Sequence, residues 1–149
     1  MTSIKLKAFA VYAVLFISLF GFATSSMAEK VFAEHKVVLQ ISDPNPFKQK
    51  LVLNVAHNIL KYYGPDLVDV EIVAFGPGLR LLFKNNVYKT RIQSLVDSGV
   101  RFSACSNTIK NMTKKLGHAP ALNPNAVRVD AGVVRILKLT KEGYTLIKP

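Results

Sequence analysis

Hydrophobic residues along the chain first follow a strand pattern and then a helix pattern. Residues 35–41 are rich in β-branched and aliphatic side chains, which favours a strand. A polar, proline-containing segment ends this strand, and Asn45 can cap a helix that has Pro46 at its first position. Gly64 and Pro65 end that helix. Its expected buried face carries Phe47, Leu51, Val55, Ile59 and Tyr62.

The same alternation of strand and helix continues to the end of the chain. Strands are predicted at residues 68–75, 100–104, 126–129 and 144–147. Helices are predicted at residues 79–83, 88–96, 106–116 and 133–142, the last with Val133, Ile136, Leu137 and Thr140 facing inward. This order predicts an α/β fold, flavodoxin-like, with three α/β/α layers and a mostly parallel five-stranded sheet covered by helices on both faces.

An uninterrupted apolar segment at residues 8–23 precedes this alternation. Two lysines lie before it, and small residues follow it up to Ala28. These are the three parts of a secretory signal peptide, so we expect a signal peptide at residues 1–28 and a periplasmic or secreted domain at residues 29–149. The alternative is a retained membrane anchor. The apolar segment would span about 24 Å as a helix, less than the ~30 Å hydrocarbon core, and we expect no stable membrane span after cleavage.

Composition narrows the classes of function. The 149 residues carry 20 Lys and Arg against 9 Asp and Glu, a net charge of +11 that falls to +9 without the two lysines of the signal peptide. The single cysteine excludes a disulfide within the chain and zinc sites with two or four cysteines, and nothing indicates a metal or a cofactor. The cations are spread out with few aromatic residues among them. This pattern argues against nucleic acid as a partner and leaves an anionic partner open.

The candidate catalytic residue is Cys105, where the third predicted strand meets the following helix. Ligands of open α/β sheets bind beyond the carboxyl ends of the strands, where loops lead into helices. The unpaired N–H groups at a helix N-terminus stabilise a thiolate and lower its pKa. Three lysines lie on the same helix, and no acidic residue occurs between Asp97 and Asp130. The alternative is a buried, inert thiol, which is the commoner state of a free cysteine.

Five further residues are candidates for the wall of a pocket around this thiol. Ser106 and Asn107 directly follow the cysteine and offer helix caps. Gly76 and Gly78 follow the carboxyl end of the second strand, in a turn that lacks the lysine and the spacing of a phosphate loop. His118 lies beyond the helix and is the candidate for a Cys–His pair with an activated nucleophile.

Several segments of the mature chain together follow one known pattern. They are Val-Val-Leu-Gln-Ile at residues 37–41, Glu-Ile-Val-Ala-Phe-Gly-Pro-Gly at 71–78, Gly-Val-Arg-Phe-Ser-Ala-Cys-Ser-Asn at 99–107 and Gly-Val-Val-Arg-Ile at 132–136. In these segments the chain resembles the DsrE/DsrF-like family over residues 35–149. The resemblance implies a three-layer α/β/α fold, assembly into trimers or hexamers, and a persulfide carried by Cys105 between partner proteins.

The chain departs from the pattern of this family in three ways. It is predicted to be exported, whereas the sulfur-relay members work in the cytoplasm. Phe75 occupies a position where relatives often have a polar residue such as histidine. There is no second cysteine to resolve a disulfide.

Three functions are consistent with these observations. In the first, a periplasmic DsrE-like protein handles sulfane sulfur as a persulfide on Cys105. Its partner would be a sulfur donor or acceptor protein or a small anionic sulfur species. The second is a non-catalytic oligomeric module that binds a small anion in the same pocket. The third is a structural or regulatory subunit with a buried cysteine. Whether the protein is an enzyme, such as a sulfurtransferase, stays open at this point.

Overall fold

The computed structural model describes residue 30 and residues 33–149. The predicted signal peptide at residues 1–28, with its cleavage site, lies outside the described residues. Among the described residues, no helix is long and apolar enough to cross a membrane.

Strands and helices alternate through the described chain, as the hydrophobic pattern predicts. Each of the five strands has bounds within one residue of those predicted. The 3₁₀ helix η1 differs most, because it begins at Gly76, inside the predicted turn. The elements are β1 (His35–Ile41), α2 (Pro46–Tyr63), β2 (Val68–Ala74), η1 (Gly76–Leu82), α3 (Lys89–Asp97), β3 (Arg101–Cys105), α4 (Ser106–Leu116), β4 (Ala126–Val129), α5 (Gly132–Lys141) and β5 (Thr145–Ile147).

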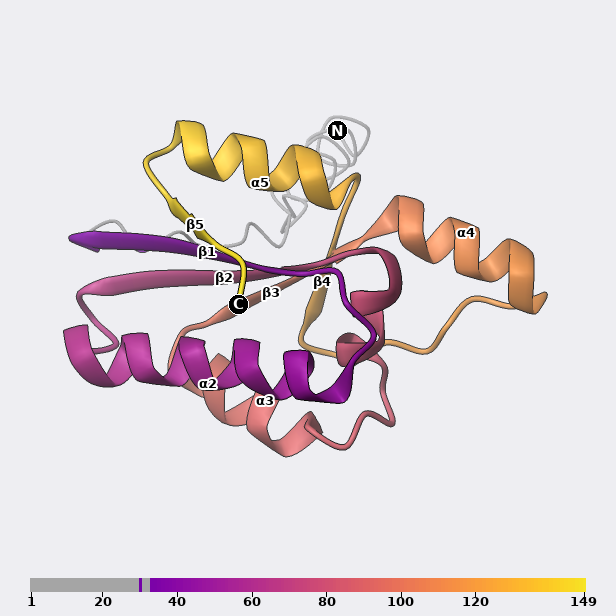
Figure 1. Cartoon of the computed structure of the whole chain (residues 1–149), viewed down its shortest axis with the longest axis horizontal. Helices are drawn as coiled ribbons and strands as arrows, with labels where there is room; N and C mark the ends of the chain where they lie inside the picture. The colour runs from indigo at the N-terminus through magenta and orange to yellow at the C-terminus, as the bar shows by residue number, and fades with distance from the viewer. Residues whose placement is uncertain (1–29, 31–32) are drawn as a thin grey trace, which may run out of the picture.

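All five strands form one parallel sheet in the order β4-β3-β2-β1-β5. The chain passes from β1 to β4 in one direction and then returns across the sheet to place β5 beside β1. Because parallel connections are right-handed, reversing the direction sends α5 to the face opposite α2 and α3. Figure 1 shows α5 above the sheet and α2 and α3 below it. The predicted three-layer α/β/α fold is confirmed.

The two faces of the sheet bury cores of different size. The larger core lies between the sheet and the helices α2 and α3, and it contains alternate residues of the central strands, such as Leu39, Ile72 and Phe102. The smaller core lies under α5 and consists of Val38, Val73, Ile136, Leu139 and Tyr144, with Phe75 packed against it. On the α5 face, β2 and β3 also carry polar residues, so apolar packing alone does not hold α5 in place.

The predicted buried face of α2 is wrong at three positions. Phe47 and Tyr62 are each 82% exposed, and Leu51 is also exposed. The buried stripe instead consists of Gln49, Val52, Leu53, Ala56 and Leu60. Both sets satisfy helical periodicity, but the small Ala56 allows the helix backbone to approach the sheet closely, whereas the two rings lie at the ends of the helix. Val55 and Ile59 flank the true face and are partly buried.

The predicted face of α5 is also wrong in part. Ile136 is buried as predicted, but Val133 and Leu137 are 54% and 56% exposed. The helix is rotated so that Leu139 enters the core and the half-buried Arg135 reaches a carboxylate in the sheet. A charged side chain therefore helps to set the rotation of this helix, which a pattern of apolar residues does not reveal.

The packing of α2 can be tested with two substitutions on opposite faces. Leu53→Ala removes a fully buried side chain, and we expect it to lower the free energy of unfolding by about 2–5 kcal/mol. Phe47→Ala removes a larger but exposed side chain and should change it by less than about 0.5 kcal/mol. Urea unfolding of both variants checks this. Equal losses would contradict the observed rotation of α2.

Candidate functional site

Cys105 lies where the chain leaves the sheet toward both faces. It is the last residue of β3 and the N-cap residue of α4, and it pairs in register with Val129 at the end of β4. The connection after β3 leads into α4, whose Ile109 packs into the core on the α2 face, whereas the connection after the neighbouring β4 leads into α5, which Figure 1 shows on the other side of the sheet. Such a switch between adjacent strands opens a crevice at their carboxyl ends, which is the usual ligand position in this class of fold.

The first turns of two helices, α4 and α5, favour the charged form of the Cys105 thiol. From α4 the contributions come from the Thr108 hydroxyl and from the backbone of Thr108 and Asn107, and the Asn107 N–H also donates to the Asp130 carbonyl at 3.2 Å. From α5 the contribution comes from the backbone of Gly132. Burial by itself raises the pKa of the Cys105 thiol, but these donors favour the thiolate and bring the pKa below its ordinary value.

The Thr108 hydroxyl is oriented by a second hydrogen bond. Its oxygen accepts from the backbone N–H of Gly76 at 2.8 Å. Because a hydroxyl carries one hydrogen and can both accept and donate, this contact leaves the Thr108 hydrogen available to the sulfur. The turn after β2 therefore takes part in the site through Thr108 and not by direct contact with the thiol.

Glycine is required at position 132 for the contact with α5. A Cβ atom there would lie 2.9 Å from the Cβ of Phe75 and about as close to its ring, distances that side-chain carbons do not tolerate. The absence of a side chain lets the first turn of α5 settle against Phe75, with its N–H directed at the sulfur. The N-terminus of α5 thus packs directly against the side chain of Phe75.

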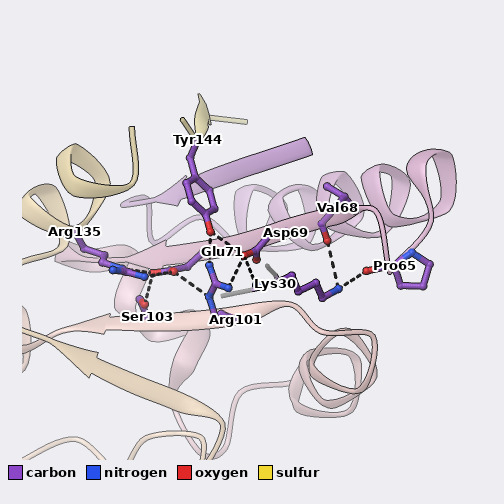
Figure 2. A network of polar contacts seen from close by, with 9 residues as sticks. All are labelled: Lys30, Pro65, Val68, Asp69, Glu71, Arg101, Ser103, Arg135 and Tyr144. Atoms are coloured by element: carbon purple, nitrogen blue, oxygen red, sulfur yellow. Dashed lines mark hydrogen bonds and ion pairs between the residues drawn. The ribbon is translucent and has the colours of Figure 1, made fainter. Parts of the chain in front are cut away.

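A network of buried charges lies on the α5 face of the sheet (Figure 2). Glu71, on β2, accepts from Arg135 through two hydrogen bonds of 2.8 and 2.7 Å. It also accepts from the Ser103 hydroxyl at 2.6 Å and from Arg101 at 3.2 Å. The Glu71 side chain is fully buried. Three elements, β2, β3 and α5, are therefore joined at one carboxylate.

The network continues toward the amino end of β2. Arg101 donates to Asp69 at 2.7 Å and to the Tyr144 hydroxyl at 2.9 Å, and that hydroxyl donates in turn to Asp69 at 2.8 Å. The backbone N–H of Lys30 also donates to Asp69, and the Lys30 ammonium donates to the carbonyls of Pro65 and Val68 (Figure 2). The far Asp69 carboxylate oxygen, Oδ1, has no hydrogen-bond partner within the described part of the chain.

The ion pairs shift the titration of their members. Burial raises the pKa of Glu71, but the hydrogen bonds from Arg135 and Ser103 outweigh it and lower the pKa below its ordinary value. The bond to Glu71 raises the pKa of Arg135. Burial raises the pKa of the Tyr144 hydroxyl. The carboxylate and both arginines are therefore charged at neutral pH, and the tyrosine is a neutral donor.

The charge network and the thiol are connected through α5. Arg135 lies one turn after Gly132 on the same helix, so the bidentate contact between Arg135 and Glu71 fixes both the height and the rotation of that first turn. The Gly132 N–H is held against the sulfur as a result. Glu71 and Arg135 do not contact the thiol, and their role is to position the helix that does.

The residues predicted to surround the cysteine have different positions and roles in the structure. The backbone N–H of Asn107 donates to the Asp130 carbonyl at 3.2 Å and contributes to the lowered pKa of the thiol, and Gly76 acts through Thr108. Ser106 occupies the first position of α4. Gly78 is buried in η1, where a Cβ would lie 2.5 Å from the Ile41 carbonyl oxygen, so it serves close packing. His118 is exposed beyond the far end of α4, about 16 Å of helix away, and its Nδ1 lies near the Ala119 carbonyl.

Two hollows lie near this end of the sheet. The β4–α5 hollow, about 220 Å³, is lined by residues 128–131 and by Val134, Arg135 and Lys138. It borders the neighbours of the thiol, since Val129 pairs with Cys105 and Ala131 precedes Gly132. The α4–η1 cavity is larger, about 530 Å³, and includes Gly76 and Thr108 in its wall. Cys105 is 5% exposed and lines neither.

Thr108 and Gly132, which contribute to the lowered pKa of the thiol, were not among the pocket residues predicted from the sequence. The sequence contains an indication for Thr108, because the side chain of a residue three positions after an N-cap can contact the N-cap residue. Gly132 had none, because its contact depends on the crossover that brings α5 beside β3. The lysines expected to help are exposed on α4, two of them in its last turn, far from the sulfur. Within the described residues, no group of three or more metal-ligating side chains is gathered.

The contribution of Thr108 can be measured on the thiol itself. Thr108→Val removes the hydroxyl donor, and a hydrogen bond to a charged group is worth about 1.5–3 kcal/mol, so the ratio of thiolate to thiol at a given pH should fall about tenfold or more. The midpoint of the pH profile of Cys105 alkylation by iodoacetamide should move upward. Thr113→Val is the matched control, because the Thr113 hydroxyl bonds to the Ile109 carbonyl on the same helix. A shift of similar size in both variants would contradict the assignment.

Acid stability tests the Glu71 cluster. The folded-state pKa of Glu71 lies below the ordinary value of about 4.5, so its contribution to stability is complete above that pH and is lost as the pH falls through the lower folded value. Glu71→Gln should lower the free energy of unfolding by about 3–5 kcal/mol at pH 7 and flatten its decline between pH 5 and 3. Urea unfolding across this range gives both values. The exposed Asp66→Asn should leave the curve unchanged; an equally steep acid decline in Glu71→Gln would refute the assignment.

The known proteins that this chain matches are solved structures. No protein-family model and no curated protein matches the chain. The protein of unknown function MTH1491 from Methanobacterium thermoautotrophicum is similar, with 27% identity and a TM-score of 0.70 over 78% of this chain and 100% of that one. The conserved protein of unknown function BT1422 from Bacteroides thetaiotaomicron shares the fold, with 16% identity and a TM-score of 0.53 over 81% of this chain and 100% of that one. These similarities support the α/β fold and assign no activity.

Proposed function

We propose that the protein carries sulfane sulfur as a persulfide on Cys105. The observation that carries this proposal is the position of Cys105, which is the N-cap residue of α4 and the register partner of the last residue of β4, the strand that leads into α5. At this position the Thr108 hydroxyl and nearby backbone N–H groups lower the pKa of the thiol although it is buried. A packed, inert cysteine needs no such groups. The same donors would stabilise the terminal charge of a persulfide, because it is an anion of similar size at the same place.

The transfer step is a displacement at sulfur. The Cys105 thiolate attacks the outer sulfur of thiosulfate, a new S–S bond forms to the cysteine, and sulfite leaves with the electron pair of the bond that breaks. With a polysulfide donor, the leaving group is the polysulfide shortened by one sulfur. An acceptor thiolate then takes the outer sulfur and regenerates the Cys105 thiolate. No external oxidant or reductant is required in either direction.

The β4–α5 hollow supports an anionic donor. Its lining contains Arg128, Arg135 and Lys138 against one acidic residue, Asp130. It lies beside the strand and the loop that contact Cys105, so an anion bound there would be near the thiol. Because Cys105 is 5% exposed, the transfer needs a small outward movement of the β4–α5 connection, and a compact inorganic anion suits that access better than a bulky peptide.

The family and the location belong to the same proposal. The segment at residues 99–107 supports a DsrE-like sulfur carrier, and the apolar segment at residues 8–23 supports a periplasmic or secreted location. The chain has one cysteine, so the persulfide would pass to the thiol of a partner protein and not resolve as an internal disulfide. Assembly into trimers or hexamers stays a prediction from the family resemblance.

Intact-mass measurement after incubation with thiosulfate or polysulfide tests the proposal. We expect a gain of one sulfur atom in the native protein, removal of that sulfur by dithiothreitol, and no gain in Cys105→Ser. Absence of the adduct, or an adduct that survives Cys105→Ser, would refute sulfur transfer. The non-catalytic anion-binding module would then be the better interpretation, provided that Cys105→Ser retains thermal stabilisation by thiosulfate.

A further inference from the structure

The α4–η1 cavity is the larger of the two hollows at this end of the sheet. Its volume of about 530 Å³ lies within the range of ordinary ligand sites, and it opens at the carboxyl end of the sheet, between η1 and α4. The proposed sulfur chemistry does not use it, because the cysteine does not line it. The cavity therefore needs its own explanation.

Most of the cavity wall is apolar. Pro77 and Phe83 form the η1 side, and Met112 and Leu116 form the α4 side, one turn apart. Leu116 is 55% exposed and Phe83 and Met112 are partly exposed, although all three are large apolar side chains. A hydrocarbon or aromatic group in the cavity would cover this surface, at a gain of about 25 cal/mol per Å² of apolar area removed from water.

The remaining lining is polar and of one charge sign. Arg80 comes from η1 and Lys115 from the last turn of α4, and both are exposed. Asn111 and Thr108 add an amide and a hydroxyl. No acidic side chain is among the described residues that line the cavity. An inorganic anion would leave the apolar wall exposed, and a neutral hydrocarbon would leave both cations unused.

We infer that the cavity binds an amphipathic organic anion: a carboxylate attached to a hydrocarbon chain or an aromatic ring. The apolar part lies between Phe83 and Met112, and the carboxylate lies near Arg80 and Lys115. We expect a small molecule because the volume is that of an ordinary small-molecule site and a cation lies on each wall, Arg80 on η1 and Lys115 on α4. This site is separate from the proposed sulfur transfer, although Thr108 belongs to the surroundings of both.

Octanoate is a suitable probe, and Met112 is a suitable reporter. The chain has 3 methionines, of which Met112 alone lies within the described residues, so a ¹³C-methyl-methionine label places one assignable signal on the cavity wall. Met112→Leu identifies this signal. We expect octanoate to shift it in a saturable manner with one site per chain, and octanol to bind more weakly.

Charge variants identify the carboxylate position. Arg80→Gln with Lys115→Gln should weaken octanoate binding about three- to tenfold, because each exposed ion pair contributes about 0.2–1 kcal/mol, and should leave octanol unchanged. Lys110→Gln with Lys114→Gln is the matched control, since both lysines are exposed on α4 and neither lines the cavity. Cys105→Ser should bind octanoate as the unmodified chain does, so this test and the sulfur-transfer test can fail separately.

Three results would overturn the inference. The first is an unsaturable or absent shift of the Met112 signal. The second is equal weakening by both pairs of charge variants, which would indicate attraction by net charge alone. The third is a Met112 signal that depends on protein concentration and not on octanoate, which would indicate that a second copy of the chain covers the cavity.

Discussion

The carboxylate of Glu71 lies inside a parallel sheet, where an unpaired charge would cost several kcal/mol. Its hydrogen bonds to Arg135, Arg101 and Ser103 remove that cost and at the same time join β2, β3 and α5. The small core under α5 contains five buried residues, so this helix depends on directional contacts more than the helices on the other face do. The two hydrogen bonds between Arg135 and Glu71 fix the rotation of α5 and its distance from the sheet, whereas apolar contact alone constrains both less. The position of Gly132 beside the thiol therefore depends on this ion pair.

Two helix N-termini meet at the sulfur because the chain turns back after β4, so that the connections leaving the neighbouring strands β3 and β4 lead into helices in different layers. One of them belongs to the helix that begins at Cys105 itself, and the other arrives from the opposite layer. Each contributes N–H groups that have no partner within their own helix. The groups that lower the pKa of the Cys105 thiol are the Thr108 hydroxyl and backbone N–H groups, with no cationic side chain or histidine among them. This explains why the pKa of the thiol falls although the lysines of α4 are exposed.

The sequence predicted the order of strands and helices well, because each element is encoded by its own hydrophobic period and its own caps. Asn45, for example, accepts from the Phe47 N–H as a capping residue should. The rotation of helices was predicted less well. On α2, two stripes fit the period equally, and on α5 the position of Arg135 decides between them. The pairing of Glu71 with Arg135 joins residues 64 apart, and no local pattern contains it. Cys105 could be found from its place in the chain, whereas Gly132 could be found only once the strand order was known.

The groups that lower the pKa of the thiol come from segments far apart in the chain. Asn107 and Thr108 follow Cys105 directly, whereas Gly132 belongs to the segment that crosses the sheet to place β5 beside β1. The pairing of Val37 with Thr145 joins the two ends of the domain, and such long-range contacts are slow to form. A chain whose C-terminal segment has not docked lacks the contribution of Gly132. The pKa of Cys105 therefore reports whether the C-terminal segment is in place.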